Sequence, residues 1–333
     1  MTSGGRARCG IPAEQSSIVI ADILGLLVSL GILTIAGDQF VVGVGRVASA
    51  MRVRPTVVGA VVGGFGTSIP ELIVAGVAAG RGDAQIAMGS AVGSIIANVA
   101  LGLAAAALIA PVRVDSRTVR REAPLSVGAV VVFAAVGYRG LSRPEGVLLG
   151  LGLAAALAGL LLNLRTAPRR DELATEVRDF FDGPRSHGPP RESVRTAVSI
   201  AAMVGGAELL VQAASSLARR LGIEQGFVGL TLVAIGTSAP LIAAAIQAAR
   251  RGDHDLVVGN VLGCNLFIAL VGGPIIAFIR PGPAGDVGVV SLVLMAGLCA
   301  ASWAFMARGS LVRRSEAILL LVEYAGALPF VAR

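Results

Sequence analysis

The chain has 333 residues, of which 55% are hydrophobic and only 15% are charged, and its mean hydropathy is +0.80. Soluble domains carry about 25% charged residues, so this composition excludes an ordinary soluble protein. The net charge of +7 does not indicate nucleic-acid binding, because the basic residues, all of them Arg, lie in short loops between long apolar blocks.

Ten apolar segments are predicted to cross a membrane as helices. Several reach the ~20 residues that span ~30 Å of hydrocarbon, and their apolar character is continuous rather than alternating. In chain order the segments lie at residues 18–36 (extending to about 50), 56–79, 85–110, 123–138, 145–164, 194–217, 226–249, 256–279, 287–307 and 315–331. The sequence therefore predicts an all-α polytopic membrane protein with ten transmembrane helices.

The two halves of the chain repeat each other. Residues 58–111 align with residues 228–281 at a constant offset of 170, with 18 identities in 54 positions. A polar stretch separates the halves. We therefore predict a first five-helix repeat at 1–165, a linker at 166–193 and a second five-helix repeat at 194–333.

The odd number of spans in each predicted repeat determines its orientation. Because five is odd, the second repeat enters the membrane the opposite way up, as in the inverted-topology repeats of secondary transporters. The loops after spans one, three, five, seven and nine hold 19 Arg, whereas the other side, with both tails, holds 9. The positive-inside rule then predicts a multi-pass cell-membrane protein with a cytoplasmic linker and both termini extracytoplasmic.

Two GTSxP segments at matching positions are the strongest functional signal. The first places Glu71 inside an apolar span, where a carboxylate costs at least ~2.5 kcal/mol and indicates function by default. Pro70 and Pro240 are expected to bend or break their helices, because proline removes a backbone hydrogen bond. Thr67 shares a helical face with Glu71, and Ser68 lies beside it. These hydroxyl and carboxylate oxygens, with freed carbonyls, are hard ligands suited to Na⁺ or Ca²⁺.

A polar stripe follows each GTSxP segment. The stripe is Ser90, Ser94 and Asn98 in the first repeat, and Asn260, Cys264 and Ile268 in the second. Gly89 and Gly93 flank the first stripe and are expected to let another helix approach closely. Asn98 is a candidate ligand, as is Asn265, about 100° from the second stripe, because burying an unpaired amide is costly.

These segments resemble the two alpha-repeats of the sodium/calcium exchanger (Ca²⁺:cation antiporter) family. "GTSIPE" is followed by "GSAVGSIIAN", and "GTSAP" is followed by "GNVLGCNLF". The resemblance implies a secondary-active antiporter that moves Na⁺ or H⁺ one way and Ca²⁺ the other by alternating access. The positions that match the family's ligands are Thr67, Ser68, Glu71 and Asn98 in the first repeat, and Thr237 and Ser238 in the second.

The second repeat departs from the family pattern. Leu241 replaces a Glu, Ile268 replaces an Asn or Asp, and Cys264 replaces a Ser. Ca²⁺ usually takes more than one carboxylate among its oxygen ligands, whereas a single Glu71 suits Na⁺ or a proton. Three interpretations remain open: a cation antiporter of this family, a monovalent cation/H⁺ exchanger, and a homologue that no longer transports and serves a structural or regulatory role.

An enzyme is the least favoured interpretation, because the sequence contains no evident nucleophile–base pair or metal triad. The 3 Cys are far apart and the 2 His lie in polar loops, which argues against a disulfide framework and a Cys/His metal site. We expect no cofactor. The expected partners are the lipid bilayer and the transported inorganic cations, namely Na⁺, with Ca²⁺ or H⁺ as further candidates.

The predicted topology can be tested by accessibility labelling. A cysteine introduced by Ser186→Cys, in the linker, should be labelled only from the cytoplasmic side. One introduced by Thr2→Cys should be labelled only from outside, because the Arg bias puts the linker and the N-terminus on opposite faces. Labelling of both positions from the same face would contradict the inverted ten-span arrangement.

Overall fold

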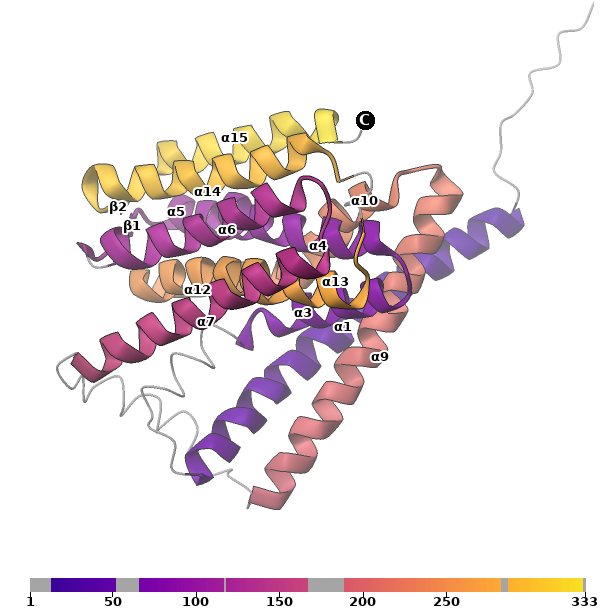
Figure 1. Cartoon of the computed structure of the whole chain (residues 1–333). Helices are drawn as coiled ribbons and strands as arrows, with labels where there is room; N and C mark the ends of the chain where they lie inside the picture. The colour runs from indigo at the N-terminus through magenta and orange to yellow at the C-terminus, as the bar shows by residue number, and fades with distance from the viewer. Residues whose placement is uncertain (1–12, 52–65, 117, 167–188, 283–286, 332–333) are drawn as a thin grey trace, which may run out of the picture.

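The computed structural model describes residues 13–51, 66–116, 118–166, 189–282 and 287–331, which form a bundle of helices (Figure 1). In chain order the helices are α1 (Ala13–Ala50), α3 (Ile69–Gly80), α4 (Ala84–Ala97), α5 (Ala104–Ile109), α6 (Ala123–Gly137), α7 (Arg143–Thr166), α9 (Pro189–Leu221), α10 (Gln225–Val228), α11 (Ala234–Arg251), α12 (His254–Phe267), α13 (Gly273–Ile279), α14 (Val289–Gly309) and α15 (Arg314–Val331). Single π-helical turns lie at Asn98–Leu103, Thr118–Glu122, Gly229–Val233 and Ile268–Gly272. Strand β1 (Val112–Arg113) pairs antiparallel with β2 (Leu311–Val312), which ties the chain after α5 to the α14–α15 connection.

Several helical runs along the chain are long enough to cross a membrane. Within the described residues, six helical runs are long and apolar enough to cross a membrane: Val19–Val47, Ala84–Ile109, Pro190–Leu221, Gln225–Arg251, His254–Ile279 and Val289–Gly309. They confirm the predicted helical, multi-pass membrane protein. The start of the predicted segment 56–79 and most of the predicted linker 166–193 lie outside the described residues.

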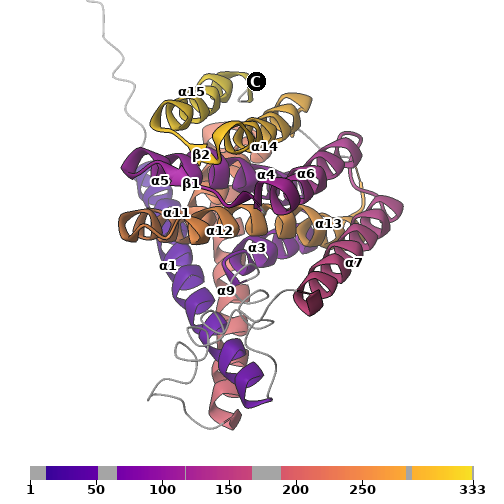
Figure 2. The same ribbon diagram turned by 90° about the vertical axis from the view of Figure 1, so that its left-hand side faces the viewer.

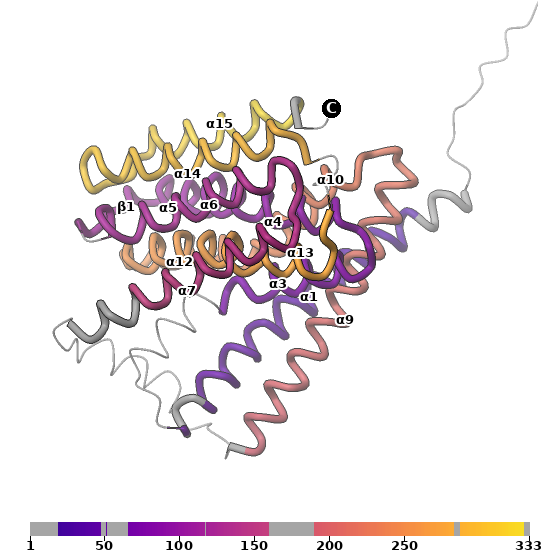
Figure 3. Tube along the Cα trace, in the orientation of Figure 1, coloured from indigo at the N-terminus to yellow at the C-terminus, as the bar shows by residue number. Residues whose placement is uncertain are grey.

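The helices are stacked in layers, which Figures 1 and 2 show from two directions. Helices α14 and α15 lie at the top, α4 to α6 lie below them, and α12 and α13 come next. Helices α1 and α9 run side by side and slant across the lower side of the stack, and the trace in Figure 3 follows the same path. This arrangement places α4 and α12 in the interior of the bundle.

Helix α4 forms the centre of the protein. Every residue from Ile86 to Ala100 is buried. A Cβ atom added at Gly89 or Gly93 would overlap the backbone carbonyl of Gly226 or Leu230, in the helical run that leads into α11. The prediction that these two glycines allow close approach of another helix is therefore confirmed.

The element boundaries follow the sequence repeat. Helices α4 and α12 are 14 residues each and begin 170 residues apart, at Ala84 and His254. Each is followed by a π-helical turn, and each follows a loop whose glycine is in the left-handed region, Gly82 at φ +86° and Gly252 at φ +79°. The two halves of the chain therefore form matching local structures.

The two prolines behave differently. Thr67 and Ser68 form a turn, and α3 begins at Ile69 with Pro70 in its first turn, where proline is tolerated. Pro240 was expected to bend or break its helix. The helix is not broken, because α11 runs without interruption from Ala234 to Arg251. A π-helical turn lies directly upstream, and Thr237 Oγ1 donates to the carbonyls of Val233 and Ala234 at 3.1 and 3.2 Å. Pro240 has no N–H to donate to the carbonyl of Gly236, four residues earlier, and neither of these two bonds reaches that carbonyl.

Ion pairs hold the long helices α1 and α9 together at both ends. Arg220 Nε lies 3.1 Å from Asp22 Oδ2, and Arg46 Nη1 lies 3.0 Å from Glu192 Oε1. The start of α1 thus meets the end of α9, so the two helices are antiparallel. Glu208 of α9 also pairs with Arg81 in the α3–α4 loop, which connects this helix pair to the rest of the bundle.

The repeat mates Gly89 and Gly259 provide a matched test of the packing. Gly89→Ala should destabilise the protein by about 1–3 kcal/mol, the usual cost of overpacking, because its Cβ meets backbone. Gly259→Ala should be neutral or slightly stabilising, because nothing lies within 4 Å of its added Cβ and Ala favours helix. Thermal unfolding of the detergent-solubilised protein measures both, and an equal loss in the two variants would contradict the packing described.

Candidate functional site

The polar residues predicted from the two repeats lie together in the interior of the bundle. Thr67 and Ser68 lie in the turn before α3, and Glu71 lies in the first turn of α3. Asn98 begins the π-helical turn after α4. The other members of the predicted set are Thr237 and Ser238 on α11 and Asn265 on α12. Each of the seven residues forms a hydrogen bond with a residue of another segment, and both halves of the chain contribute to this polar network.

The turn before α3 is held against α12. Thr67 Oγ1 donates to Asn260 Oδ1 at 2.8 Å, and Ser68 Oγ donates to Cys264 Sγ at 2.7 Å. Asn260 and Cys264 are four residues apart and therefore lie on one face of α12. These bonds fix the start of α3, and with it the direction in which Glu71 points.

Glu71 is the charged member of this network. Its side chain is only 3% exposed, and Oε1 accepts a long hydrogen bond of 3.5 Å from Ser238 Oγ. Its Oε2 is buried and has no hydrogen-bond partner among the described residues. The ion pairs found in the described residues do not include Glu71. The carboxylate is therefore left under-compensated where burial of a charge is most costly.

Asn98 provides a second open acceptor. Its side chain is fully buried, and Nδ2 donates to Asn265 Oδ1 at 2.9 Å. Its Oδ1 has no partner among the described residues. Asn265 in turn donates from Nδ2 to the carbonyl of Ile95 at 3.5 Å and to Cys299 Sγ at 3.8 Å. The donor side of the Asn98 amide is thus fixed, and its oxygen is left available.

The hydroxyls of the first stripe divide between two roles. Ser94 Oγ lies 3.4 Å from Thr237 Oγ1 and connects α4 to α11. Ser90 Oγ instead donates to the carbonyl of Ala87 in its own helix. The predicted stripe therefore contributes Ser94 and Asn98 to the polar network, whereas Ser90 satisfies its own backbone.

Several residues of the network were missing from the predicted site. Asn260 and Cys264 were recognised as a stripe, but neither was predicted to line the site. Their signal was present at the constant offset of 170, because they align with Ser90 and Ser94. Cys299, on α14, had no comparable signal in the sequence.

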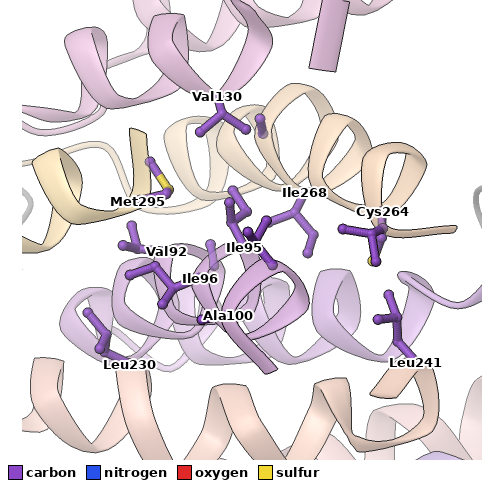
Figure 4. Packing of buried hydrophobic residues seen from close by; sticks show 14 of the residues in the cluster. Val92, Ile95, Ile96, Ala100, Val130, Leu230, Leu241, Cys264, Ile268 and Met295 are labelled. Carbon is purple, nitrogen blue, oxygen red and sulfur yellow. The ribbon is translucent and has the colours of Figure 1, made fainter. Parts of the chain in front are cut away.

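Apolar side chains occupy positions 241 and 268, where the second repeat lacks a polar ligand. Leu241 and Ile268 are fully buried, at 0% and 1% exposure. Figure 4 shows them in the apolar cluster with Ile95 and Cys264. A Cβ added at Gly102 would lie 3.0 Å from Leu241 Cδ2, so the Leu241 side chain extends to the turn after Asn98.

The resulting site is an oxygen-rich cluster with one carboxyl group, that of Glu71. No group of three His, Cys, Asp or Glu side chains gathers in the described residues. Hydroxyl, amide and carboxylate oxygens suit hard cations such as Na⁺. A single carboxylate balances one positive charge, and two buried acceptors have no protein donor among the described residues.

Comparisons with known proteins agree on one family. The family described as "Sodium/calcium exchanger protein" matches residues 21–162 and 194–332. The chain is 32% identical over 310 residues to the "Putative antiporter CaxA" of Alkalimonas amylolytica, covering 90% of this chain and 95% of that protein. It is 33% identical over 261 residues to the "Inner membrane protein YrbG" of Escherichia coli, covering 77% and 79%.

A solved structure resembles the fold over nearly the whole chain. The sodium–calcium exchanger NCX_Mj, soaked with 2.5 mM Na⁺ and 0.1 mM Ca²⁺, superposes with a TM-score of 0.62 at 27% identity. The match covers 93% of this chain and 98% of that one. Like the matched family, this structure belongs to a membrane cation exchanger.

Proposed function

Because the chain belongs to the sodium/calcium exchanger family of membrane cation antiporters, we propose that it exchanges cations by alternating access at a site centred on Glu71. In this proposal Glu71 is the sole charged ligand. Neutral oxygens come from Thr67, Ser68 and Asn98 in the first repeat, and from Thr237, Ser238 and Asn265 in the second.

The observation that carries this proposal is the pair of open acceptors in a buried site. Glu71 Oε2 and Asn98 Oδ1 are both buried and both lack a hydrogen-bond partner among the described residues. Leaving such groups unsatisfied costs about 1–3 kcal/mol each, and more for a charged group. A cation bound between them removes that cost, which gives the arrangement a physical reason to persist.

The proposed architecture is two inverted five-helix repeats, at residues 1–165 and 194–333, joined by the cytoplasmic linker 166–193. Two observations support it. Matching elements begin 170 residues apart, as α4 and α12 do. Moreover, α1 and α9 occupy corresponding places in the two halves and run antiparallel, as inverted repeats require. With ten spans, both termini are extracytoplasmic.

Charge determines which cargo fits best. A single carboxylate neutralises Na⁺, whereas a divalent ion would keep about one unit of uncompensated charge inside the membrane. Such a charge costs several kcal/mol even after relaxation. Leu241 and Ile268, both buried, occupy the positions where further ligands would be needed. We therefore expect strong coupling to Na⁺ and weak binding of Ca²⁺.

Exchange of a monovalent cation against H⁺ is the second candidate. The observation that favours it is the absence of a basic partner for Glu71 in the described ion pairs. When the cation leaves, a proton can neutralise the carboxylate and allow the empty site to reorient. A non-transporting homologue is opposed by the retained Glu71, since a buried charge is costly to keep without use.

Glu71→Gln tests the proposed charged ligand. This substitution keeps the shape of the side chain and removes its charge, so Na⁺-coupled flux in proteoliposomes should fall to the background of empty vesicles. Wild-type flux should also fall at acid pH as the carboxylate binds protons. Glu224→Gln is the matched control, since Glu224 is exposed and lies outside the site. Flux retained by Glu71→Gln would contradict the proposal.

Leu241→Glu tests the missing second charge. A carboxylate at this position should raise Ca²⁺ affinity by about tenfold or more, a change of at least about 1.4 kcal/mol, because it completes the charge that a dication needs. Ile268→Asp should add to the effect. Leu241→Gln is the matched control without charge. Calorimetry of Ca²⁺ binding measures all of these, and micromolar Ca²⁺ affinity in the unmodified protein would contradict the charge argument.

A further inference from the structure

We propose that Cys264 supplies a sulfur ligand to this site and that the divalent cargo of the protein is a soft cation, represented by Cd²⁺, in preference to Ca²⁺. The inference rests on the proposed function, because it uses the same site and the same Glu71. It goes further by naming the chemical class of divalent ion that the site accepts.

Cys264 lies inside the polar network. Its side chain is fully buried, and its sulfur accepts the 2.7 Å hydrogen bond from Ser68. The thiol therefore contacts one proposed oxygen ligand, Ser68, and lies in the same cluster as the other proposed ligands.

A second observation indicates a ligand at this place. Glu71 and Asn98 are 3% and 0% exposed, and each keeps one oxygen without a partner among the described residues. Glu71 follows Ser68, whose hydroxyl bonds to the sulfur, by three residues, and Asn98 bonds to Asn265, the residue after Cys264. A buried cysteine by itself is most often a packing residue, but these open acceptors give the cluster the character of a ligand set.

A sulfur ligand changes which dications the site can neutralise. Ca²⁺ is a hard ion that takes oxygen ligands and gains nothing from a thiol. A soft dication binds sulfur as the thiolate, and the thiol proton is released to water as the ion enters. Glu71 and Cys264 then supply two negative charges for the two positive charges of the ion. The thiolate thus replaces the negative charge that is missing because position 241 is a Leu, and it does so only for soft dications.

The number of charged ligands also suits transport. The described residues contain no group of three His, Cys, Asp or Glu side chains. Tightly bound structural metals use four such ligands. One thiolate and one carboxylate, completed by neutral oxygens, allow the ion to bind and then to leave.

Cys299 provides an internal comparison. It is also fully buried, but it lies on α14 and contacts the amide nitrogen of Asn265 at 3.8 Å. The sulfur of Cys264 accepts a 2.7 Å hydrogen bond from the hydroxyl of Ser68, whereas that of Cys299 accepts a longer one, 3.8 Å, from the amide nitrogen of Asn265. The two thiols are therefore expected to respond differently to a soft cation.

The test measures Cd²⁺ in two ways, on a Cys9→Ser background that leaves Cys264 and Cys299 as the two thiols. Titration of the detergent-solubilised protein with Cd²⁺ should produce the ultraviolet charge-transfer absorption of a Cd²⁺–thiolate bond. Proteoliposomes loaded with Na⁺ should take up radioactive Cd²⁺ in preference to Ca²⁺. Cys264→Ser should abolish the absorption and lower the Cd²⁺/Ca²⁺ uptake ratio by about tenfold or more, because a hydroxyl is a hard ligand. Cys299→Ser should change neither.

The outcomes separate this inference from the proposed function. If Na⁺-coupled flux depends on Glu71 but Cys264→Ser leaves the absorption and the uptake ratio unchanged, the sulfur ligand is wrong and the proposed function stands. If Cd²⁺ produces no thiolate absorption in the folded wild type, the inference is also overturned, whether or not the variant folds. If Glu71→Gln leaves flux intact, both proposals fail together.

Discussion

The burial of one carboxylate without a counter-charge in the described structure is the constraint on which the rest of the site depends. Glu71 lies in the first turn of α3, where the free backbone N–H groups and the helix dipole favour a negative charge. The hydrogen bond that it accepts from Ser238 is long at 3.5 Å. The hydroxyls and amides around it supply oxygens but no positive charge. For this reason we propose a mobile cation as the species that satisfies this arrangement.

Two local irregularities make the site possible in an otherwise apolar bundle. The chain turns at Thr67 and Ser68, so that α3 starts in the interior of the bundle, with its two hydroxyls bonded to α12. The π-helical turn that begins at Asn98 ends the regular part of α4 at the amide which faces Asn265. Such turns frequently mark functional sites, because they alter the direction of side chains and free backbone groups.

Much of this site could be predicted from the sequence, because a carboxylate, amides and paired hydroxyls are conspicuous in apolar spans. The position of Asn265 was harder to predict. Periodicity assumes one inward face for each helix, whereas α12 contacts the turn before α3 through Cys264 and α4 through Asn265, on faces about 100° apart. Whether Pro240 bends or breaks its helix was likewise left open by the sequence, because proline chemistry alone does not decide between the two, and α11 is not broken there.

Asymmetry between otherwise matching halves is the feature that gives this protein its proposed specificity. Helices α4 and α12 have equal lengths, yet Leu241 stands where the repeat mate of Glu71 would carry charge, and Cys264 stands opposite Ser94 in the alignment. Direct location of the bound ion tests the central claim most sharply, by anomalous diffraction from crystals in which Na⁺ has been exchanged for Tl⁺. The account predicts one peak in contact with Glu71 Oε2 and Asn98 Oδ1, which disappears when Na⁺ is added back. A Tl⁺ peak elsewhere in the bundle, with none beside Glu71, would contradict it.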